Sequence, residues 1–394
     1  MNTGMRDGED LVGENRHPVG ADGRSSRRRV LHFGSGGGKG VTRVLTDLAQ
    51  GHATRGAYES LIVYRRKRGQ PLSEAFRRDL AASGVAFREV GPRPAFRTMA
   101  ELRTIIREFR PDVFVAHGYS EHLSGRTVAL AEGVPVIVQA EHAHERYKGF
   151  DLGRSRRLAK RTDAIIGVSR GVVERLRELG FPSEKLHAIY NGVRVERFMA
   201  AQPRPWAERE PAVIMAARFG QPKDQRTLIR AAALLRDRGM PVRVRLAGGG
   251  RKLALWRAQR LVHRLGLGDL VEFLGPRSDL PEVFRRHQVS VMATHREGFG
   301  LVVIEAMAAG CAVVGSRSPG VEELIEHGRT GWLATDGDPE SFAEGILAAL
   351  GGAGAAWAAA GAAYACGGFS VDRMAAEYEA LFDRLLAAKK RSPR

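Results

Sequence analysis

The chain has 394 residues, of which 43% are hydrophobic and 27% are charged, so it is globular but too long for one compact core. This composition excludes fibrous, collagen-like and wholly disordered proteins. The two cysteines, Cys311 and Cys366, cannot build a disulfide framework or a four-ligand zinc site, and we expect a reducing compartment. No run of about 18 uncharged apolar residues is present, and residues 1–29 contain no apolar signal core.

The formal net charge is +18, and most of the excess lies in the first half of the chain. Residues 60–110 hold 12 Lys or Arg against 5 Asp or Glu, and residues 146–161 hold 7 against 1. One interpretation is a binding surface for anions, and the other is an arginine bias spread over solvated faces. Aromatic residues make up only 7% and are not interleaved with the arginine runs, which disfavours nucleic acid.

Short apolar runs alternate with helical patterns along the first half of the chain. Strands are predicted at 29–33, 61–64, 112–116, 134–139, 164–168 and 186–190. Residues 96–110 predict an amphipathic helix that ends before Pro111. A glycine-rich loop over 34–40 follows the first strand, with helical spacing after it.

A segment with three prolines and few apolar residues, 199–211, predicts a linker, and the alternation then restarts. Strands are predicted at 212–216, 242–247, 271–274, 289–293 and 312–315, and helices at 227–236, 301–309, 321–327 and 374–389. Alternating strands and helices indicate parallel sheets covered on both faces. We therefore expect an α/β protein with two Rossmann-like domains that face a cleft at the carboxyl ends of their strands.

These patterns divide the chain into five parts. The predicted boundaries are a disordered extension over 1–28, a first domain over 29–198, a linker over 199–211, a second domain over 212–374, and a C-terminal helix and tail over 375–394.

The glycine loop over 34–40 could let backbone amides approach a phosphate. It is not a Walker A loop, because Lys39 is followed by Gly40 and not by Ser or Thr. No G-x-G-x-x-G register fits a dinucleotide fingerprint either. A purely structural tight turn remains the alternative.

Three polar residues follow predicted strands and should therefore lie at the cleft. Arg218 and Lys223 come just after the first strand of the second domain, and an Arg with a Lys suits a pyrophosphate. His117 directly follows the strand at 112–116. The alternatives are a solvated surface for the two cations and a satisfied structural role for the histidine.

The strongest signal is the segment from Glu297 to Glu305, in which two carboxylates flank a glycine turn and an apolar run. Gly298 and Gly300 allow a sharp turn into a helix that starts near Leu301, and the amides of that start can hold an anion. Glu305 lies about one turn inside an otherwise apolar helix, where a carboxylate is costly unless it is paired. Such a carboxylate could accept hydrogen bonds from the hydroxyl pair of a sugar.

Two groups of potential metal ligands are better explained otherwise. Asp336 and Asp338 form a D-x-D pair but precede a helix, so helix capping is the favoured interpretation. His142, His144 and Glu145 lack helical spacing and a further ligand group. No metal site is predicted.

In the order and spacing of its motifs, the chain resembles the family 4 retaining glycosyltransferases of GT-B fold over residues 30–385. The matching pieces are Gly36 to Gly40, Asp112 to Gly118, Val168-Ser169, Tyr190 to Val193 with Phe198, Arg218 with Lys223, Phe273 to Gly275, Glu297 to Glu305 followed by Ala306 to Gly310, and Gly320 to Glu323 with Gly328, Thr330 and Gly331.

The resemblance implies that the second domain binds a nucleotide-sugar. Arg218 and Lys223 would then neutralise the diphosphate, and Glu305 would hold the ribose. Glu297 and the backbone of Phe299, Gly300, Leu301 and Val302 would hold sugar and phosphate, and the peptide near Leu274 would meet the base.

The resemblance also implies that the first domain binds the acceptor, with Gly37 and Gly38 near the phosphates and His117 near the transferred sugar. The C-terminal helix would cross back to the first domain. Transfer would proceed with retention of configuration, with no metal and no cofactor beyond the nucleotide-sugar as co-substrate.

The leading hypothesis is thus a glycosyltransferase that builds a cell-surface polysaccharide, lipopolysaccharide or glycolipid. The alternatives are an epimerase or phosphorylase of the same fold, and a non-catalytic basic protein that binds membrane or nucleic acid. The expected partners are a nucleotide-sugar and a glycan or lipid-linked acceptor. We expect a cytoplasmic protein, and the basic first half suggests peripheral docking on the anionic inner face of the cytoplasmic membrane.

Overall fold

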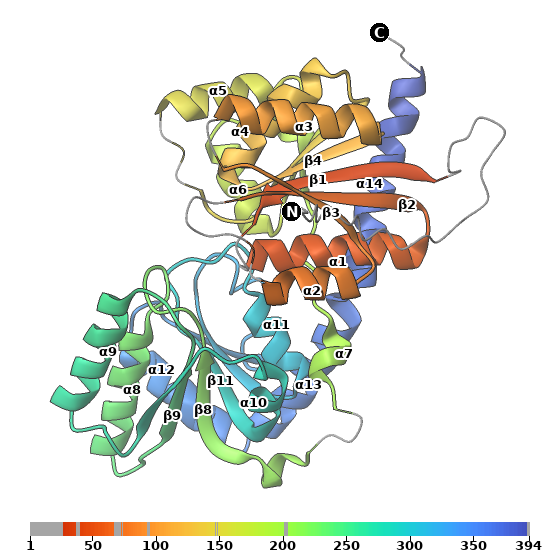
Figure 1. Cartoon of the computed structure of the whole chain (residues 1–394). Coiled ribbons are helices and arrows are strands. Elements are labelled where there is room, and N and C mark those ends of the chain that lie inside the picture. Colours follow the sequence, from red (N-terminus) through yellow and green to blue (C-terminus); the bar gives the residue numbers. More distant parts are fainter. Residues whose placement is uncertain are drawn as a thin grey trace, which may run out of the picture.

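The computed structural model describes residues 27–36, 40–66, 72, 74–92, 95–145, 147, 149–200 and 204–391. Of the extension predicted over 1–28, residues 1–26 lie outside this described part, and Arg28 already begins the first strand. The chain forms two lobes, each built around its own parallel sheet (Figure 1).

The N-terminal lobe holds a seven-stranded sheet of order β3-β2-β1-β4-β5-β6-β7. Its strands are β1 (Arg28–Ser35), β2 (Tyr58–Arg65), β3 (Ala86–Val90), β4 (Val113–His117), β5 (Val136–Glu141), β6 (Ala164–Gly167) and β7 (Leu186–Ala188). Its helices are α1 (Gly40–Arg55), α2 (Glu74–Ala82), α3 (Ala95–Phe109), α4 (Tyr119–Ala131), α5 (Gly149–Ala159) and α6 (Arg170–Glu178). Strands β4 to β6 are buried along their whole length because their apolar runs are covered on both faces.

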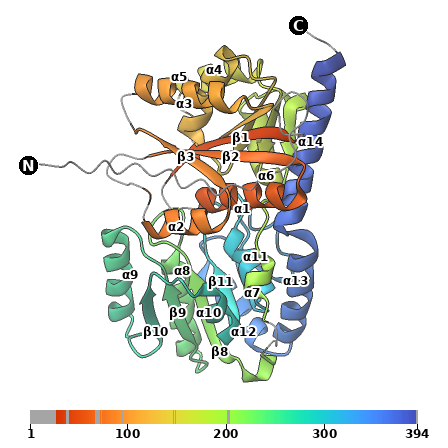
Figure 2. The same ribbon diagram turned by 45° about the vertical axis from the view of Figure 1, so that its right-hand side comes forward.

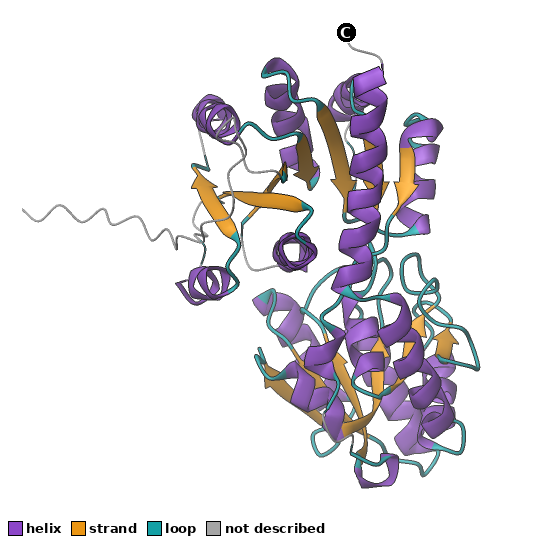
Figure 3. Cartoon of the chain, turned by 90° about the vertical axis from the view of Figure 1, so that its right-hand side faces the viewer, coloured by secondary structure: helices purple, strands orange, loops and turns teal. Residues whose placement is uncertain are grey.

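The C-terminal lobe holds a six-stranded sheet of order β10-β9-β8-β11-β12-β13. Its strands are β8 (Glu210–Ala216), β9 (Arg243–Ala247), β10 (Val271–Gly275), β11 (His287–Met292), β12 (Ala312–Ser316) and β13 (Gly331–Ala334). Its helices are α8 (Gln225–Asp237), α9 (Lys252–Arg264), α10 (Leu280–Arg286), α11 (Leu301–Ala308), α12 (Pro339–Leu350) and α13 (Gly354–Gly368), and short α7 (Val195–Phe198) precedes the lobe. Figure 3 shows helices on both sides of each sheet.

The last helix, α14 (Val371–Arg391), returns from the C-terminal lobe and runs alongside the N-terminal sheet (Figure 2). Met374, Tyr378 and Phe382 are buried in one cluster with residues of α1, β1, β4 and β5. The crossover that the family resemblance implied is therefore present, and its helix begins at Val371, four residues before the predicted boundary.

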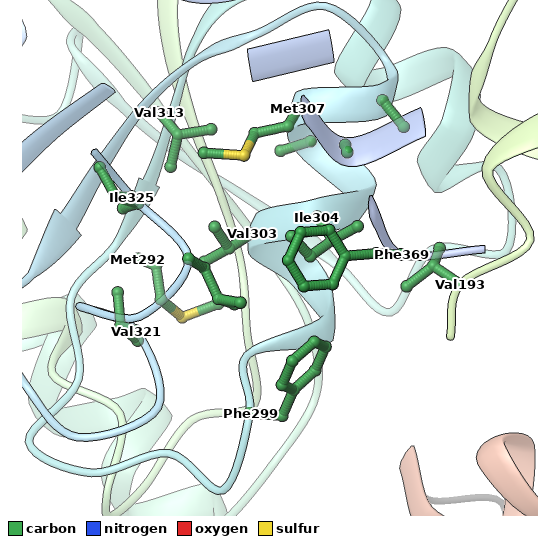
Figure 4. Close-up of a cluster of buried hydrophobic side chains, with 14 of the residues drawn as sticks. Val193, Met292, Phe299, Val303, Ile304, Met307, Val313, Val321, Ile325 and Phe369 are labelled. Atoms are coloured by element: carbon green, nitrogen blue, oxygen red, sulfur yellow. The ribbon is translucent and has the colours of Figure 1, made fainter. Parts of the chain in front are cut away.

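Helix α11 is fixed by a cluster of apolar side chains around it (Figure 4). Val303, Ile304 and Met307 point from the helix into this cluster. Residues of β11, β12 and the following loop surround them, and Val193 and Phe369 close the cluster. Dense packing of this kind leaves α11 little freedom, so the start of the helix has a defined position relative to both lobes.

The helix predicted over 321–327 is wrong, because this segment forms turns. Gly320 and Gly328 flank it with φ of 82° and 77°, and Leu324 N–H donates to the Val321 carbonyl three residues back. So short a segment gains too few bonds to offset the cost of helix nucleation. Its apolar spacing instead reflects contacts with α11, to which Val321, Leu324 and Ile325 contribute.

Glu323, in the same loop, joins the two lobes. Its carboxylate accepts hydrogen bonds from the N–H groups of Arg170 and Gly171, at 2.8 and 2.6 Å, where α6 begins. The Tyr190 hydroxyl donates to it at 2.9 Å. Free N–H groups at a helix start favour an anion, so this contact holds the lobes around the cleft.

Candidate active site

A cleft of about 870 Å³ lies between the lobes, at the carboxyl ends of the C-terminal strands. Most of its wall comes from loops that follow β8, β9, β10 and β11. The N-terminal lobe contributes the start of α1 together with His142 and Asn191. This is the position at which parallel α/β sheets bind ligands.

Arg218 and Lys223 both line the cleft, as predicted. Gln225 donates to the Arg218 carbonyl at 3.0 Å and so fixes the loop after β8. Lys223 forms an ion pair with Glu297, another predicted residue on the same wall. Arg218 is exposed and has no ion-pair partner among the residues that the structure describes, so its guanidinium is free to bind an anion.

The start of α11 faces the cleft and is shaped by two glycines. A Cβ on Gly298 would lie 1.9 Å from the His142 carbonyl oxygen, so only glycine permits this approach of the two lobes. Gly300 has φ 90° and leaves the first turn without a side-chain cap. The predicted Phe299, Gly300, Leu301 and Val302 all line the cleft, and the free amides here suit a phosphate.

Glu305 lies one turn deeper on α11 and is not part of the cleft wall as the structure stands. Its carboxylate is buried and accepts a hydrogen bond of 2.5 Å from Arg43 Nη1 of the opposite lobe. Burial raises the pKa of this carboxyl group, and the Arg43 guanidinium acts against that rise.

His117 is the last residue of β4, and the prediction that it lies at the cleft is wrong, because its ring is fully buried and does not line the cleft. Its Nδ1 is 2.9 Å from His142 Nε2, and its Nε2 is 3.1 Å from His32 Nδ1. Burial lowers the pKa of His142 to about 4 and keeps the pKa of His32 and His117 well below the ordinary value. A neutral row of three imidazoles therefore lies behind the cleft, and His142 is its member on the wall.

The remaining predicted positions are placed as follows. Leu274 is half-buried in β10 beside the cleft, and Pro276 and Arg277 just beyond it form the wall. Gly37 and Gly38 lie outside the described residues, and Gly40, the next glycine of that loop, lines the cleft.

Several wall residues were not predicted as site residues: His142, Asn191, Gln221, Pro222, Gly248, Gly249, Arg251, Pro276, Arg277 and Leu280. Gly248 and Gly249 had a signal, because they follow a strand as the first glycine loop does. Asn191 belongs to a matched motif but carried no distinctive chemistry. His142 was considered only as a metal ligand.

Of the acidic pair after β13, Asp338 caps a helix as predicted, whereas Asp336 does not. Asp338 accepts from the Glu340 N–H at 3.0 Å, where α12 begins. Asp336 contacts His295 Nδ1 at 3.0 Å. Within the described ranges, no three His, Cys, Asp or Glu side chains converge in a way that could hold a metal ion.

The two lobes match two protein families. Residues 38–197 match the family described as Glycosyltransferase Family 4, and residues 210–351 match Glycosyl transferases group 1. The D-inositol 3-phosphate glycosyltransferase of Streptomyces scabiei is 31% identical over 56% of this chain and 56% of its own length. The amylovoran biosynthesis glycosyltransferase AmsK of Erwinia amylovora is 26% identical over 61% of this chain. That match covers 62% of AmsK, so this chain spans somewhat more than half the length of these curated relatives.

The solved structures show the same fold. Anabaena Alr3699/HepE in complex with UDP-glucose superposes with a TM-score of 0.77 at 22% identity, covering 89% of this chain and 99% of that one. The sucrose-phosphate synthase of Thermosynechococcus elongatus superposes with a TM-score of 0.75 at 19% identity, covering 92% and 100%. At this level of identity the likeness establishes the arrangement of the two lobes.

Proposed function

The chain belongs to glycosyltransferase family 4 and has the GT-B fold, and from that premise we propose which reaction its cleft performs. The proposed reaction moves a sugar from a nucleotide-sugar to a hydroxyl of a glycan or lipid-linked acceptor, with retention and without a metal ion. The observation that carries it is the convergence of Arg218, Lys223 and the uncapped start of α11 on one cleft.

These groups suit the charge that develops during sugar transfer. The bond between the anomeric carbon and the β-phosphate oxygen breaks, and negative charge grows on the diphosphate. Two fixed cations and a helix start stabilise such charge without having to reorganise during the reaction. Retention would follow if the acceptor oxygen attacks on the same face, while its proton passes to an oxygen of the departing phosphate.

The two carboxylates would have different tasks. Glu297 already holds Lys223 and lies on the wall, where it can also accept hydrogen bonds from sugar hydroxyls. Glu305 would accept from the ribose hydroxyls. His142 lines the cleft from the N-terminal lobe, and His117, which contacts its Nε2, would hold its ring in place.

The acceptor class is proposed from the exposed surface of the N-terminal lobe. Part of the basic excess is neutralised: Arg103 and Arg107 both pair with Glu132, at 2.8 and 2.7 Å. On and beside α5, however, Arg154, Arg157 and Arg161 are exposed without an ion pair among the described residues, and Phe150 is 85% exposed. Arginines beside an exposed phenylalanine suit an anionic lipid surface.

Vesicle sedimentation tests this lipid surface. Phosphatidylglycerol vesicles should bind the protein at low salt, phosphatidylcholine vesicles should not, and high salt should release it. Replacing Phe150 by Ser and Arg154 and Arg157 by Gln should reduce binding, whereas Arg329→Gln, at an exposed position of the C-terminal lobe, should not. Equal recovery in the supernatant with both lipids would favour a soluble acceptor.

None of the described helices has both the length and the apolar composition needed to span a membrane. Helices α12 and α13 would have them only if taken together, and the two are bent by 92° at the break between them.

The reaction itself is tested by incubating the protein with UDP-, GDP- and ADP-sugars and measuring free nucleoside diphosphate. We expect slow hydrolysis of one donor that EDTA does not abolish, and an axial-to-axial or equatorial-to-equatorial outcome when an acceptor is supplied. An epimerase would return an intact nucleotide-sugar with altered sugar. A strict need for a divalent cation would contradict the metal-free mechanism.

A further inference from the structure

We propose that Arg43 of the N-terminal lobe positions the Glu305 carboxylate for the donor ribose, so that both lobes contribute to donor binding. This inference rests on the proposed function, since it assumes that a nucleotide occupies the cleft. Arg43 would be a positioning residue that acts through Glu305.

The two residues meet where the starts of two helices face each other. Gly40 at the start of α1 lies close to Leu301 at the start of α11, since a Cβ on Gly40 would be 3.7 Å from the leucine side chain. Arg43 follows Gly40 by three residues, and Glu305 follows Leu301 by four. Each charged residue therefore shares a helix face with a residue of the cleft wall, one turn behind it.

Arg43 opposes the effect of burial on the Glu305 carboxyl group. The Glu305 side chain is 3% exposed and that of Arg43 is 34% exposed, and the bond between them is 2.5 Å long. Burial is the largest influence on the pKa of Glu305 and raises it, and Arg43 is the largest of the influences that lower it. Asp47 raises this pKa and Arg197 lowers it, each to a smaller extent. An ionised carboxylate only accepts hydrogen bonds, and so it can serve two ribose hydroxyls that both donate.

Arg43 is itself held by its own lobe. Its Nε lies 3.7 Å from Asp47 one turn further along α1, and Arg194 Nε donates to the other oxygen of Asp47 at 2.5 Å. The guanidinium carbon of Arg43 also lies 5.8 Å from the centre of the Phe198 ring. The charges thus alternate from Arg194 through Asp47 and Arg43 to Glu305, which fixes the carboxylate from the opposite side of the cleft.

Calorimetric titration with UDP, GDP and ADP tests this role, using whichever nucleotide the wild type binds. Arg43→Gln should weaken binding by about 10-fold, because it leaves a buried carboxyl group without its charged partner. Arg43→Lys should restore part of the affinity. Glu305→Gln should also weaken binding, and adding Arg43→Gln to it should have little further effect, since Arg43 acts through Glu305.

The pH dependence separates positioning from a general structural effect. Without Arg43 the pKa of Glu305 is higher, so its ionised fraction, and with it nucleotide affinity, should fall more steeply below neutral pH than in the wild type. Arg55→Gln is the matched control, because Arg55 lies on the same helix and pairs with Glu379 and Asp372 away from the cleft. This variant should bind nucleotide like the wild type.

The possible failures are distinguishable. A wild type that binds none of the three nucleotides would contradict the proposed function itself. A wild type that binds one of them while Arg43→Gln binds it equally well would overturn only the role of Arg43. Tighter binding by Arg43→Gln would mean that Arg43 competes with the ribose for Glu305, which also overturns the proposal.

Discussion

The two lobes build their walls of the cleft in different ways. The C-terminal lobe contributes whole loops, among them the one from Arg218 to Lys223 and the one from Glu297 to Val302. Apart from the start of α1, the N-terminal lobe contributes single residues, His142 and Asn191, that are far apart in sequence. The wall from the C-terminal lobe is thus built by local segments, whereas the wall from the N-terminal lobe depends on tertiary packing.

The interiors of the lobes differ as well. The N-terminal lobe buries a row of imidazoles, the Glu141 carboxyl group and the guanidinium of Arg126. The last of these donates to Thr162 and Ser155 and to the carbonyl of His122. The cluster around α11 is made of apolar side chains. The N-terminal lobe should therefore respond to pH more strongly than the apolar cluster around α11.

The largest effect is expected from helix α14, which follows the C-terminal lobe in the sequence but packs against the N-terminal lobe. Phe382→Ala removes a fully buried ring from α14 and should destabilise the N-terminal lobe by about 3–5 kcal/mol. Urea unfolding, monitored by amide hydrogen exchange in each lobe, would measure this loss of stability. The exposed Arg384→Ala is the control, and loss of protection in the C-terminal lobe alone would contradict the assignment of α14.

On the cleft wall of the C-terminal lobe, Lys223→Ala should lower turnover by about 100-fold, since one fixed charge contact in a transition state is worth roughly 2.7–4 kcal/mol. Steady-state release of nucleoside diphosphate would measure it. Lys390→Ala, an exposed position near the end of α14, should leave turnover unchanged. Unchanged turnover in Lys223→Ala would place the diphosphate elsewhere.

The substitution Gly298→Ala tests the close contact between the two lobes. The added methyl group would meet the His142 carbonyl, so the lobes must separate, and we expect turnover to fall by about 10-fold as the positions of cleft groups shift. Small-angle scattering should show a more open molecule. Gly268→Ala is the control, because nothing lies near that position. A variant as compact and as active as the wild type would show that the close approach of Gly298 to the His142 carbonyl is not needed.

A further contrast between the lobes is the response of their stability to pH. Burial lowers the pKa of His142 to about 4, and that of His32 and His117 well below 6.5, so unfolding takes up protons below pH 6.5. Stability from these groups is present above pH 6.5 and is lost as pH falls toward 4, by about 1.4 kcal/mol per pH unit for each proton.

One buried carboxyl group acts in the opposite direction. Burial raises the pKa of Glu141 to about 8, so its contribution is present at low pH and is lost as pH rises through 8. The N-terminal lobe should therefore be most stable near pH 6.5, and Glu141→Gln should remove the loss on the alkaline side. Chemical unfolding at a series of pH values would measure this. A free energy of unfolding that does not change with pH would contradict the titration of these buried groups.

The sequence predicted the described strands except β3 and β13, because most buried parallel strands are continuous apolar runs, as in β4 to β6. It predicted most of the cleft wall of the C-terminal lobe, because glycines and charges there stand together in short segments. The helix over 321–327 was wrong because apolar spacing in a turn can serve packing. The pair of Arg43 and Glu305, 262 residues apart, could not be predicted, since neither residue signals the other.

The central claim is that Arg218 and Lys223 bind the diphosphate of a nucleotide in this cleft. Titrating UDP, GDP and ADP into the wild type and into an Arg218→Ala, Lys223→Ala double variant tests it most directly. We expect saturable binding of one nucleotide, weakened by about 100-fold or more in the double variant, with the melting temperature of the free protein little changed. Equal affinity in the two proteins would contradict it.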